Sequence, residues 1–334
     1  MTGSATGPAE GTAGQRTALL ADIGATNARF ALLREGLLGE VLNLRVTDHA
    51  TSYGAVEQAL ERLGCPETPQ AAALAFAGPV SEARAEMTNA GWDTTVSELR
   101  RRFGFRQVRL LNDYTALALS LDRLGREDRR TIGPALPGSE GPAQGPLAVL
   151  GPGSGLGVAA LLLTGTGSLP LVSEGGHATM PATDEVEAEI ISLLRQDFGH
   201  VSGERLLSGP GLASLHHALA RLQGSAEGPL DPAEVTRRGL AGDDPLCREA
   251  LERFCLFLGT FAGNIALSYG ARGGVFLGGG ILPRFPDLLA ASGFRARFED
   301  KGRFRDYLSA IPTWLITRPN AAFLGLAAVL AEGR

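Results

Sequence analysis

The order of short strands and helices occurs twice in this chain, once in each half, and this repeat constrains the fold more than any single motif does. Three closely spaced apolar runs open the first half, at residues 17–24, 27–33 and 39–46. Strands that follow each other so closely form an antiparallel meander. Three similar runs open the second half, at residues 147–150, 156–163 and 168–173. We therefore expect an α/β protein of two similar halves, with a ligand bound in the cleft between them.

Each meander is followed by helices and further strands. Apolar spacing, capping residues and breakers predict the helices at residues 52–63, 94–103 (with a threonine cap), 114–121, 185–198, 211–222, 232–240, 245–269 and 321–330. The remaining strands are predicted at residues 71–76, 108–111, 274–277 and 313–316. Four prolines and several glycines make residues 133–146 a loop, and a plausible junction between the halves.

The two halves predict two domains. Residues 1–16 lack the apolar stretch of a secretory signal, so we expect a flexible tail. If the last helix returns to the first half, the small domain comprises residues 17–123 and 318–334. The large domain then comprises residues 124–317.

Composition excludes several classes of protein. A net charge of −5 disfavours a large nucleic-acid surface, and no continuous apolar stretch is long enough to span a membrane. The three cysteines are isolated from one another, which argues against a zinc knuckle or a disulfide framework and fits a reducing cytoplasm. Lys301 is the only lysine, so a phosphate-binding lysine is almost excluded.

The chain has 45 glycines, about twice the usual share, and eight of them lie in three short loops. At residues 22–27 a carboxylate, a turn and a hydroxyl suit a magnesium-bound triphosphate, with Asp22 holding Mg²⁺ through water. The alternating glycines at 151–157 allow close approach of a charged group, although this is neither a Walker loop nor a dinucleotide fingerprint. Gly278, Gly279 and Gly280 could accommodate a base or ribose. Plain turns and a helix entry are the alternatives at these loops.

A second group of polar residues has the character of a site that reads hydroxyl groups. Asn112 and Asp113 lie between a strand and a helix, where α/β sheets present functional groups, although Asp113 could simply cap the helix. Glu174 and His177 lie three residues apart across two glycines, and Glu204 follows a helix end. A solvated turn and a surface position are the alternatives for these three.

Taken together, the chain over residues 17–330 resembles the proteobacterial-type glucokinase family of the hexokinase–actin–Hsp70 superfamily. The resemblance rests on seven segments in order: DIGATNARFALL, LLNDYTALALS, GPGSGLGVA, SEGGH, GHVSGERLLSGPGL, GGVFLGGGILPRF and GFRARFEDKGRF. It implies two ribonuclease-H-like α/β domains that close over ATP and glucose. It also implies transfer of the γ-phosphoryl group of ATP to the 6-hydroxyl of glucose, in a cytoplasmic and homodimeric enzyme.

The resemblance also implies a role for each candidate residue. Asp113 would be the general base, while Asn112, Glu174, His177 and Glu204 would hold sugar hydroxyls. The nucleotide and its Mg²⁺ would be bound by Asp22, Gly24, Thr26, Asn27, Gly151, Gly153, Ser154, Gly155, Gly278, Gly279 and Gly280.

The chain departs from the family pattern at two of these positions. Ala25 replaces a usual glycine, which would cost roughly 1 kcal/mol if the position required a left-handed backbone. Ser154 replaces a usual threonine and keeps the hydroxyl. The cysteine-rich zinc motif of the related repressor–kinase family is absent from the sequence, as is an N-terminal helix-turn-helix.

Three other functions stay open at this point. A kinase for another hexose, such as mannose or fructose, would show the same hydroxyl-reading residues. An actin- or Hsp70-like ATPase would lack Glu174, His177 and Glu204 and would hydrolyse ATP without sugar. A non-catalytic sugar sensor would lack Asp113.

Overall fold

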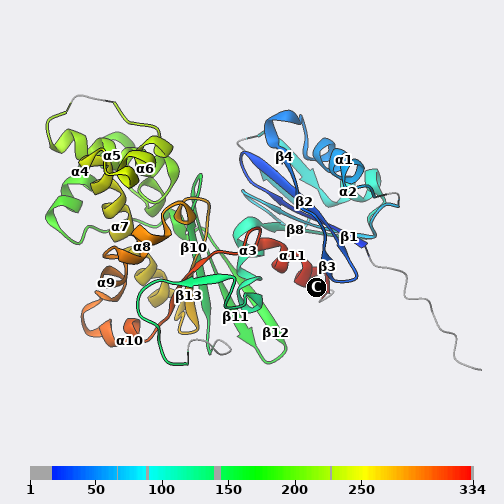
Figure 1. Ribbon diagram of the computed structural model, residues 1–334. Helices are drawn as coiled ribbons and strands as arrows, with labels where there is room; N and C mark the ends of the chain where they lie inside the picture. The colour runs from blue at the N-terminus through cyan, green and yellow to red at the C-terminus, as the bar shows by residue number, and fades with distance from the viewer. Residues whose placement is uncertain (1–16, 66, 88–89, 139–143, 226–227, 332–334) are drawn as a thin grey trace, which may run out of the picture. The chain divides into compact units, whose positions relative to one another are not determined.

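The computed structural model describes residues 17–331, apart from 66, 88–89, 139–143 and 226–227 (Figure 1). The expected tail at residues 1–16 lies outside the described residues. The chain divides into two compact units, one of residues up to Leu111 together with the chain from Val329, and one of Asn112–Ala328. The domain boundaries expected at 123/124 and 317/318 differ from this division and stay a prediction.

The first unit is built on one sheet whose strand order is β3-β2-β1-β5-β8, with β4 also paired to β2. β1 runs antiparallel to β2 and parallel to β5. Its apolar core includes the fully buried side chains of Leu19, Phe30 and Phe76. The strands are β1 (Thr17–Ile23), β2 (Asn27–Arg34), β3 (Leu37–Leu38), β4 (Leu42–Arg45), β5 (Ala71–Phe76) and β8 (Gln107–Asn112).

The expected three-strand meander is confirmed, but its third strand is shorter than predicted. Of the strand predicted over residues 39–46 only β4 forms, paired to one end of β2, and the other end of β2 pairs with the two-residue strand β3, which precedes the predicted range. The helices are α1 (Ser52–Arg62) and α2 (Val96–Phe103), and Thr95 caps the latter. The sequence analysis missed the hairpin of β6 (Arg84–Met87) and β7 (Trp92–Thr95), where buried and exposed residues alternate.

The second unit is built on a sheet of strand order β12-β11-β10-β13-β14-β9. The first three strands form the predicted antiparallel meander, and β13 and β14 extend it in parallel with β10. The sequence analysis missed the short edge strand β9, which carries two arginines. The strands are β9 (Arg129–Thr131), β10 (Leu147–Pro152), β11 (Leu156–Thr164), β12 (Gly167–Ser173), β13 (Gly274–Leu277) and β14 (Thr313–Ile316).

Two helices of this unit pack closely on each other. A Cβ added at Gly325 of α11 (Ala322–Ala331) would lie 1.9 Å from the carbonyl oxygen of Ala116 in α3 (Asp113–Ala118). Only glycine permits this approach, because a real Cβ cannot lie so near a backbone atom. The last helix is thus fixed against the helix that begins with Asp113.

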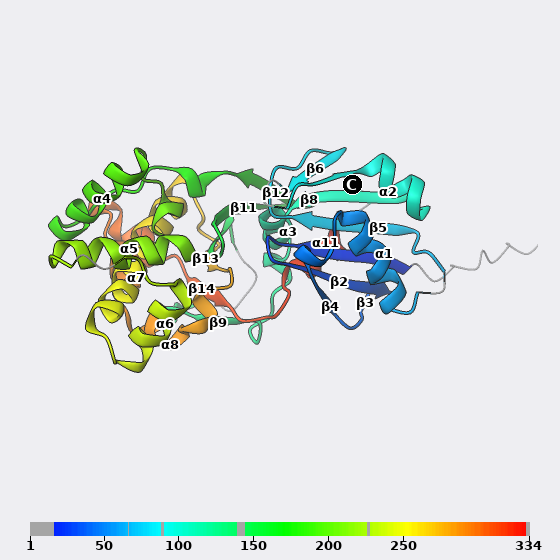
Figure 2. The same ribbon diagram turned by 90° about the horizontal axis from the view of Figure 1, so that it is seen from above.

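A group of helices gathers beside the second sheet around the long, mostly buried α7 (Figures 1 and 2). Contrary to the expectation that no apolar stretch could span a membrane, α7 is long enough and one 18-residue window within it is apolar enough to do so. However, 72% of that window is buried inside the protein, as in a core helix. The helices are α4 (Glu185–Phe198), α5 (Gly209–Leu222), α6 (Pro232–Ala241), α7 (Pro245–Tyr269), α8 (Pro286–Ala291), α9 (Phe294–Glu299) and α10 (Arg305–Ser309). The first four were predicted nearly to the residue.

Candidate active site

The glycine loop at residues 151–157 is a tight hairpin between β10 and β11. Gly151 pairs with Gly157 across the two strands, and the turn is closed by a hydrogen bond from the N–H of Gly153 to the carbonyl of Gly155, at 2.8 Å. The predicted arrangement of strand, glycine turn and strand is therefore confirmed. The N–H of Gly209, at the start of α5, donates to the carbonyl of Gly153 at 2.8 Å and attaches the turn to that helix.

Glycine is needed at different positions of this hairpin for different physical reasons. A Cβ at Gly157 would lie 1.9 Å from the ring of Tyr114, and one at Gly151 would lie 2.5 Å from the hydroxyl of the same tyrosine. A Cβ at Gly155 would lie 2.5 Å from a carboxylate oxygen of Glu204, whereas nothing lies within 4 Å of such an atom at Gly153. Three of these glycines therefore serve close packing, and Gly153 is the one with open space for a ligand.

Asn112 and Asp113 form the N-terminus of α3. The side-chain oxygen of Asn112 accepts hydrogen bonds from the backbone N–H groups of Tyr114 (2.9 Å) and Thr115 (3.3 Å), so Asn112 is the cap. Asp113 is the first helical residue, and its Oδ1 also accepts from the N–H of Tyr114, at 2.9 Å. The alternative in which Asp113 is the cap is therefore wrong, although its carboxylate does contribute to the helix start.

Tyr114 connects this helix start to the glycine hairpin. Its hydroxyl donates to the carbonyl of Gly151 at 2.5 Å, and its ring fills the space beside Gly157. The sequence analysis did not identify Tyr114 as a site residue. The available signal was an aromatic residue directly after Asp113 in a chain that also has alternating glycines at residues 151–157.

The other three predicted hydroxyl-reading residues come together. His177 ends the short 3-10 turn Gly175–His177, and Glu204 lies in a second turn, Gly203–Arg205. A hydrogen bond from the N–H of Gly203 to the carbonyl of Ala178 joins the two segments.

The imidazole of His177 stands between two carboxylates. Its Nε2 is 4.0 Å from Glu174 Oε2, and its Nδ1 is 3.9 Å from Glu204 Oε1. The side chains of Glu174 and His177 are 78% and 60% exposed, and that of Glu204 is 32% exposed. The group is a polar cup open to solvent, in which Glu204 is the most enclosed member.

Glu204 also contacts the glycine hairpin directly. Its Oε2 accepts a hydrogen bond from the N–H of Leu156, at 3.0 Å, while its Oε1 faces His177. Glu204 therefore lies at a partly exposed position but is held by a hydrogen bond to the hairpin. One carboxylate connects the predicted sugar residues with the predicted phosphate loop.

The three glycines after β13 lie against the same hairpin. The N–H of Gly278 donates to the carbonyl of Leu150 at 2.9 Å. Gly279 has a φ of +81°, and a Cβ there would lie 2.3 Å from the carbonyl oxygen of Pro152. Nothing lies within 4 Å of such an atom at Gly280. The two glycine segments predicted to bind nucleotide in this half are thus neighbours, each with one open position.

The turn at residues 22–27 belongs to the first unit. It is closed by a hydrogen bond from the N–H of Gly24 to the carbonyl of Asn27, at 2.9 Å. Asp22 Oδ2 is 3.2 Å from Arg29, a partner that the sequence analysis missed. Burial raises the pKa of the Asp22 carboxyl, although Arg29 opposes this shift. Ala25 is not among the described non-glycine residues with positive φ, so the energetic cost of placing alanine in a left-handed backbone does not arise here.

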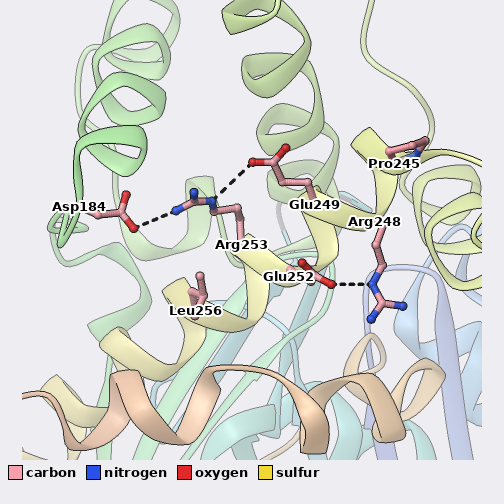
Figure 3. Close-up of a pocket in the computed structure, with 7 residues that line it drawn as sticks. All are labelled: Asp184, Pro245, Arg248, Glu249, Glu252, Arg253 and Leu256. Atoms are coloured by element: carbon pink, nitrogen blue, oxygen red, sulfur yellow. Dashed lines mark hydrogen bonds and ion pairs between the residues drawn. The ribbon is translucent and has the colours of Figure 1, made fainter.

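A cavity of about 590 Å³ in the second unit is lined by none of the predicted site residues (Figure 3). Its polar side chains pair with one another: Arg248 contacts Glu252 at 2.7 Å, and Arg253 contacts Asp184 at 2.9 Å. The lining residues are Asp184, Pro245, Arg248, Glu249, Glu252, Arg253 and Leu256. Since its charges are already compensated, this hollow offers a ligand no obvious anchor.

The comparison with known families decides which reaction this geometry serves. The family model described as Glucokinase matches residues 19–333. The chain belongs to the glucokinase family. A glucokinase of Paramagnetospirillum magneticum is 46% identical to it, over 94% of this chain and 97% of that protein. A glucokinase of Chromobacterium violaceum is also 46% identical, over 94% of this chain and 89% of that protein.

Solved structures agree with this membership of the glucokinase family. The crystal structure of a glucokinase from an Antarctic psychrotroph is 36% identical, with a TM-score of 0.83, and covers 95% of this chain and 99% of that one. A glucokinase of Balamuthia mandrillaris, solved with glucose, is 21% identical with a TM-score of 0.78, over 97% and 96% of the two chains. The latter shows the shared fold alone. The predicted hexokinase-type two-domain fold is confirmed, and the chain is an enzyme that phosphorylates glucose with ATP.

Proposed function

We propose that Asp113 is the general base of the phosphoryl transfer. Its carboxylate accepts the proton of the 6-hydroxyl of glucose as that oxygen bonds to the γ-phosphorus of ATP and the bond to the β-phosphate oxygen breaks. ADP leaves, and Asp113 later returns the proton to water. Phosphoryl transfer depends mainly on positioning and charge neutralisation. The fixed start of α3, with Asn112 as its cap, supports a positioned carboxylate.

We assign the recognition of sugar hydroxyls to Asn112, Glu174, His177 and Glu204. The observation that carries this assignment is the meeting of Glu174, His177 and Glu204 in one cup, with Glu204 hydrogen-bonded to the glycine hairpin. Carboxylates accept from hydroxyls, and an imidazole nitrogen donates or accepts, so the set can read several hydroxyls at once. A polar site of this kind penalises a sugar that lacks one of the hydroxyls.

The glycine hairpin and the segment after β13 are proposed to bind ATP. Gly153 and Gly280 have open space where a Cβ would lie, so the phosphates or the ribose can approach the backbone there. The hydroxyl of Ser154, at the tip of the turn, is available to a phosphate oxygen. Gly151, Gly155, Gly278 and Gly279 support this surface by their close packing, and we keep them as nucleotide-binding candidates.

Mg²⁺ would be held through water by Asp22, with Gly24, Thr26 and Asn27 assigned to the phosphates. A carboxylate suits Mg²⁺, which prefers oxygen ligands and keeps several waters. Arg29 engages Oδ2 of Asp22, so the other oxygen is left for a metal-bound water. When bound, the ion neutralises charge on the β- and γ-phosphates. The tight turn closed by the hydrogen bond from Gly24 to Asn27 supports a role for its backbone in phosphate binding.

We further propose that the substrates are glucose and ATP, and that the enzyme is a cytoplasmic homodimer. A coupled assay with ATP and a panel of hexoses tests the substrate choice, and light scattering after gel filtration tests the dimer. Glucose is expected to give the highest kcat/KM, and ATP hydrolysis without sugar is expected to be slow. A higher kcat/KM for mannose or fructose would replace glucose by that sugar. Fast hydrolysis without sugar would favour the ATPase alternative.

A further inference from the structure

Three side chains that commonly bind metals meet away from the predicted active site, where α5 packs on the start of α7. His216 lies on α5, Asp244 caps α7, and Cys247 lies in the first turn of α7. One ligand atom from each residue lies within 4.8 Å of the other two. His216 and Cys247 are 5% and 0% exposed. We propose that these three residues bind a divalent transition-metal ion, Zn²⁺, with water as the fourth ligand.

The kinds of ligand suit zinc more than magnesium or calcium. Mg²⁺ and Ca²⁺ take oxygen ligands, whereas Zn²⁺ takes thiolate, imidazole and carboxylate together. Bond lengths of about 2.0 to 2.3 Å place the ligand atoms of a tetrahedral zinc about 3.5 Å apart. Cys247 Sγ and Asp244 Oδ2 are already 3.3 Å apart. Small side-chain movements of His216 complete the shell, since the widest separation is 4.8 Å.

The start of α7 orients two of the ligands. Asp244 Oδ1 accepts hydrogen bonds from the N–H groups of Leu246 (2.9 Å) and Cys247 (3.2 Å), as a helix cap does. This leaves Oδ2 directed at the thiol. Capping therefore fixes the carboxylate before any metal arrives, and only the imidazole comes from another helix.

Metal binding replaces the proton of the thiol. The thiol of Cys247 donates a hydrogen bond to Asp244 Oδ2 at 3.3 Å and therefore carries its proton before an ion binds. On binding, the sulfur–hydrogen bond breaks, a zinc–sulfur bond forms, and one proton goes to the buffer. Neutral imidazole is the form that binds metal. The two anionic ligands then balance the charge of the ion.

The guanidinium of Arg238 opposes the ion. Arg238 Nη1 lies 3.9 Å from Asp244 Oδ2. The same guanidinium is hydrogen-bonded through Nε to Glu234 at 2.6 Å, which offsets much of its charge. Because Arg238 is 39% exposed, its removal is expected to leave the fold intact and to strengthen metal binding.

The test titrates tag-free, chelator-treated protein with Co²⁺, a spectroscopic substitute for Zn²⁺, and then displaces it with Zn²⁺. We expect one equivalent of Co²⁺ to give a thiolate charge-transfer band, which Zn²⁺ abolishes. Calorimetry in buffers of different ionisation enthalpy should show about one proton released per ion. A protein that gives no thiolate band at stoichiometric Co²⁺ would overturn the proposal.

Variants identify the ligands. Asp244→Asn keeps a capping oxygen and removes the charge, and should weaken Zn²⁺ binding at least about tenfold in a folded protein. Cys247→Ser should remove the charge-transfer band. Cys255→Ser is the matched control, because Cys255 is equally buried on the same helix. An unchanged band in Cys247→Ser, or its loss in Cys255→Ser, would contradict the assignment.

Arg238→Gln gives a test in the opposite direction. Removing this charge should tighten Zn²⁺ binding several-fold, because the ion no longer faces the guanidinium. Circular dichroism confirms folding of each variant. Affinity that falls or stays the same in Arg238→Gln would mean that the ion binds elsewhere, and would overturn the site.

Discussion

The ring of Tyr114 occupies the space that a side chain at Gly157 would need, with Cδ2 only 1.9 Å from the position of a Cβ there. The hydroxyl of the same tyrosine donates to the carbonyl of Gly151 at 2.5 Å. The helix that begins with Asp113 therefore packs on the hairpin at two positions, Gly151 and Gly157, that have no side chain. Gly151 and Gly157, which the sequence assigns to phosphate binding, thus also allow the packing of Tyr114 that positions the adjacent Asp113.

Gly157→Ala is expected to lower the free energy of unfolding by about 1–3 kcal/mol, since the new methyl group overpacks against Tyr114. It should also reduce kcat, because Tyr114 and the adjacent Asp113 must shift. Denaturant unfolding and steady-state kinetics measure the two effects.

Gly153→Ala is the matched control in the same hairpin. Nothing lies within 4 Å of a Cβ at Gly153, and its φ is not positive, so its stability should change by less than about 1 kcal/mol. If Gly153 faces the phosphates, the KM for ATP should rise while that for glucose stays near normal. Equal stability losses in the two variants would contradict the packing explanation.

Asp113→Asn is expected to lower kcat by at least about 100-fold, the low end of general-base effects. Asparagine keeps an oxygen for the N–H of Tyr114, so the helix start is retained. Glucose affinity, measured by equilibrium titration, should change far less than kcat. A folded variant with near-normal kcat would show that another group accepts the proton.

Two substitutions of Glu204 distinguish the role of its contact with Leu156 from that of its contact with His177. Glu204→Gln keeps an acceptor for the N–H of Leu156 but removes the charge that faces His177. Glu204→Ala removes both. We expect both variants to raise the KM for glucose, and only the alanine variant to lose stability, by about 1 kcal/mol.

The two KM values decide the role of Glu204. In the glutamine variant the KM for ATP should stay nearly unchanged, because the hairpin keeps its hydrogen bond. An equal rise of both KM values in Glu204→Gln would show that Glu204 supports the hairpin and does not read the sugar.

The local pattern of apolar and capping residues predicted most of the strands and helices, because these elements are encoded by residues that are neighbours in the sequence. The threonine cap of α2 and the bounds of α7 are examples. The packing of the Tyr114 ring against Gly157 could not be predicted in this way, because it depends on how α3 packs on β11. The proximity of His216 to Cys247 could not be predicted either, because the two residues lie on different helices and no regular sequence spacing relates such ligands.

The N-terminus of α2 gives a prediction about pH. The hydroxyl of Thr95 accepts from the N–H of Glu98 at 3.2 Å, and Glu98 is hydrogen-bonded to Arg101 at 2.8 Å and also to Arg102. These arginines hold the pKa of Glu98 at about 2, below its ordinary 4.5. A carboxyl whose pKa is lowered by folding stabilises the protein above its unfolded pKa, and this contribution is lost as pH falls towards the folded value.

Glu98→Gln should therefore be slightly less stable than the unmodified protein at pH 7, and the difference should shrink as the pH falls from about 4.5 towards about 2. The effect is small because the group is exposed and screened by salt. Denaturant midpoints at several pH values measure it. Ser97→Ala, on the same turn, is the control and should show no such pH dependence. A difference that grows on acidification would mean that the arginines do not lower the pKa of Glu98.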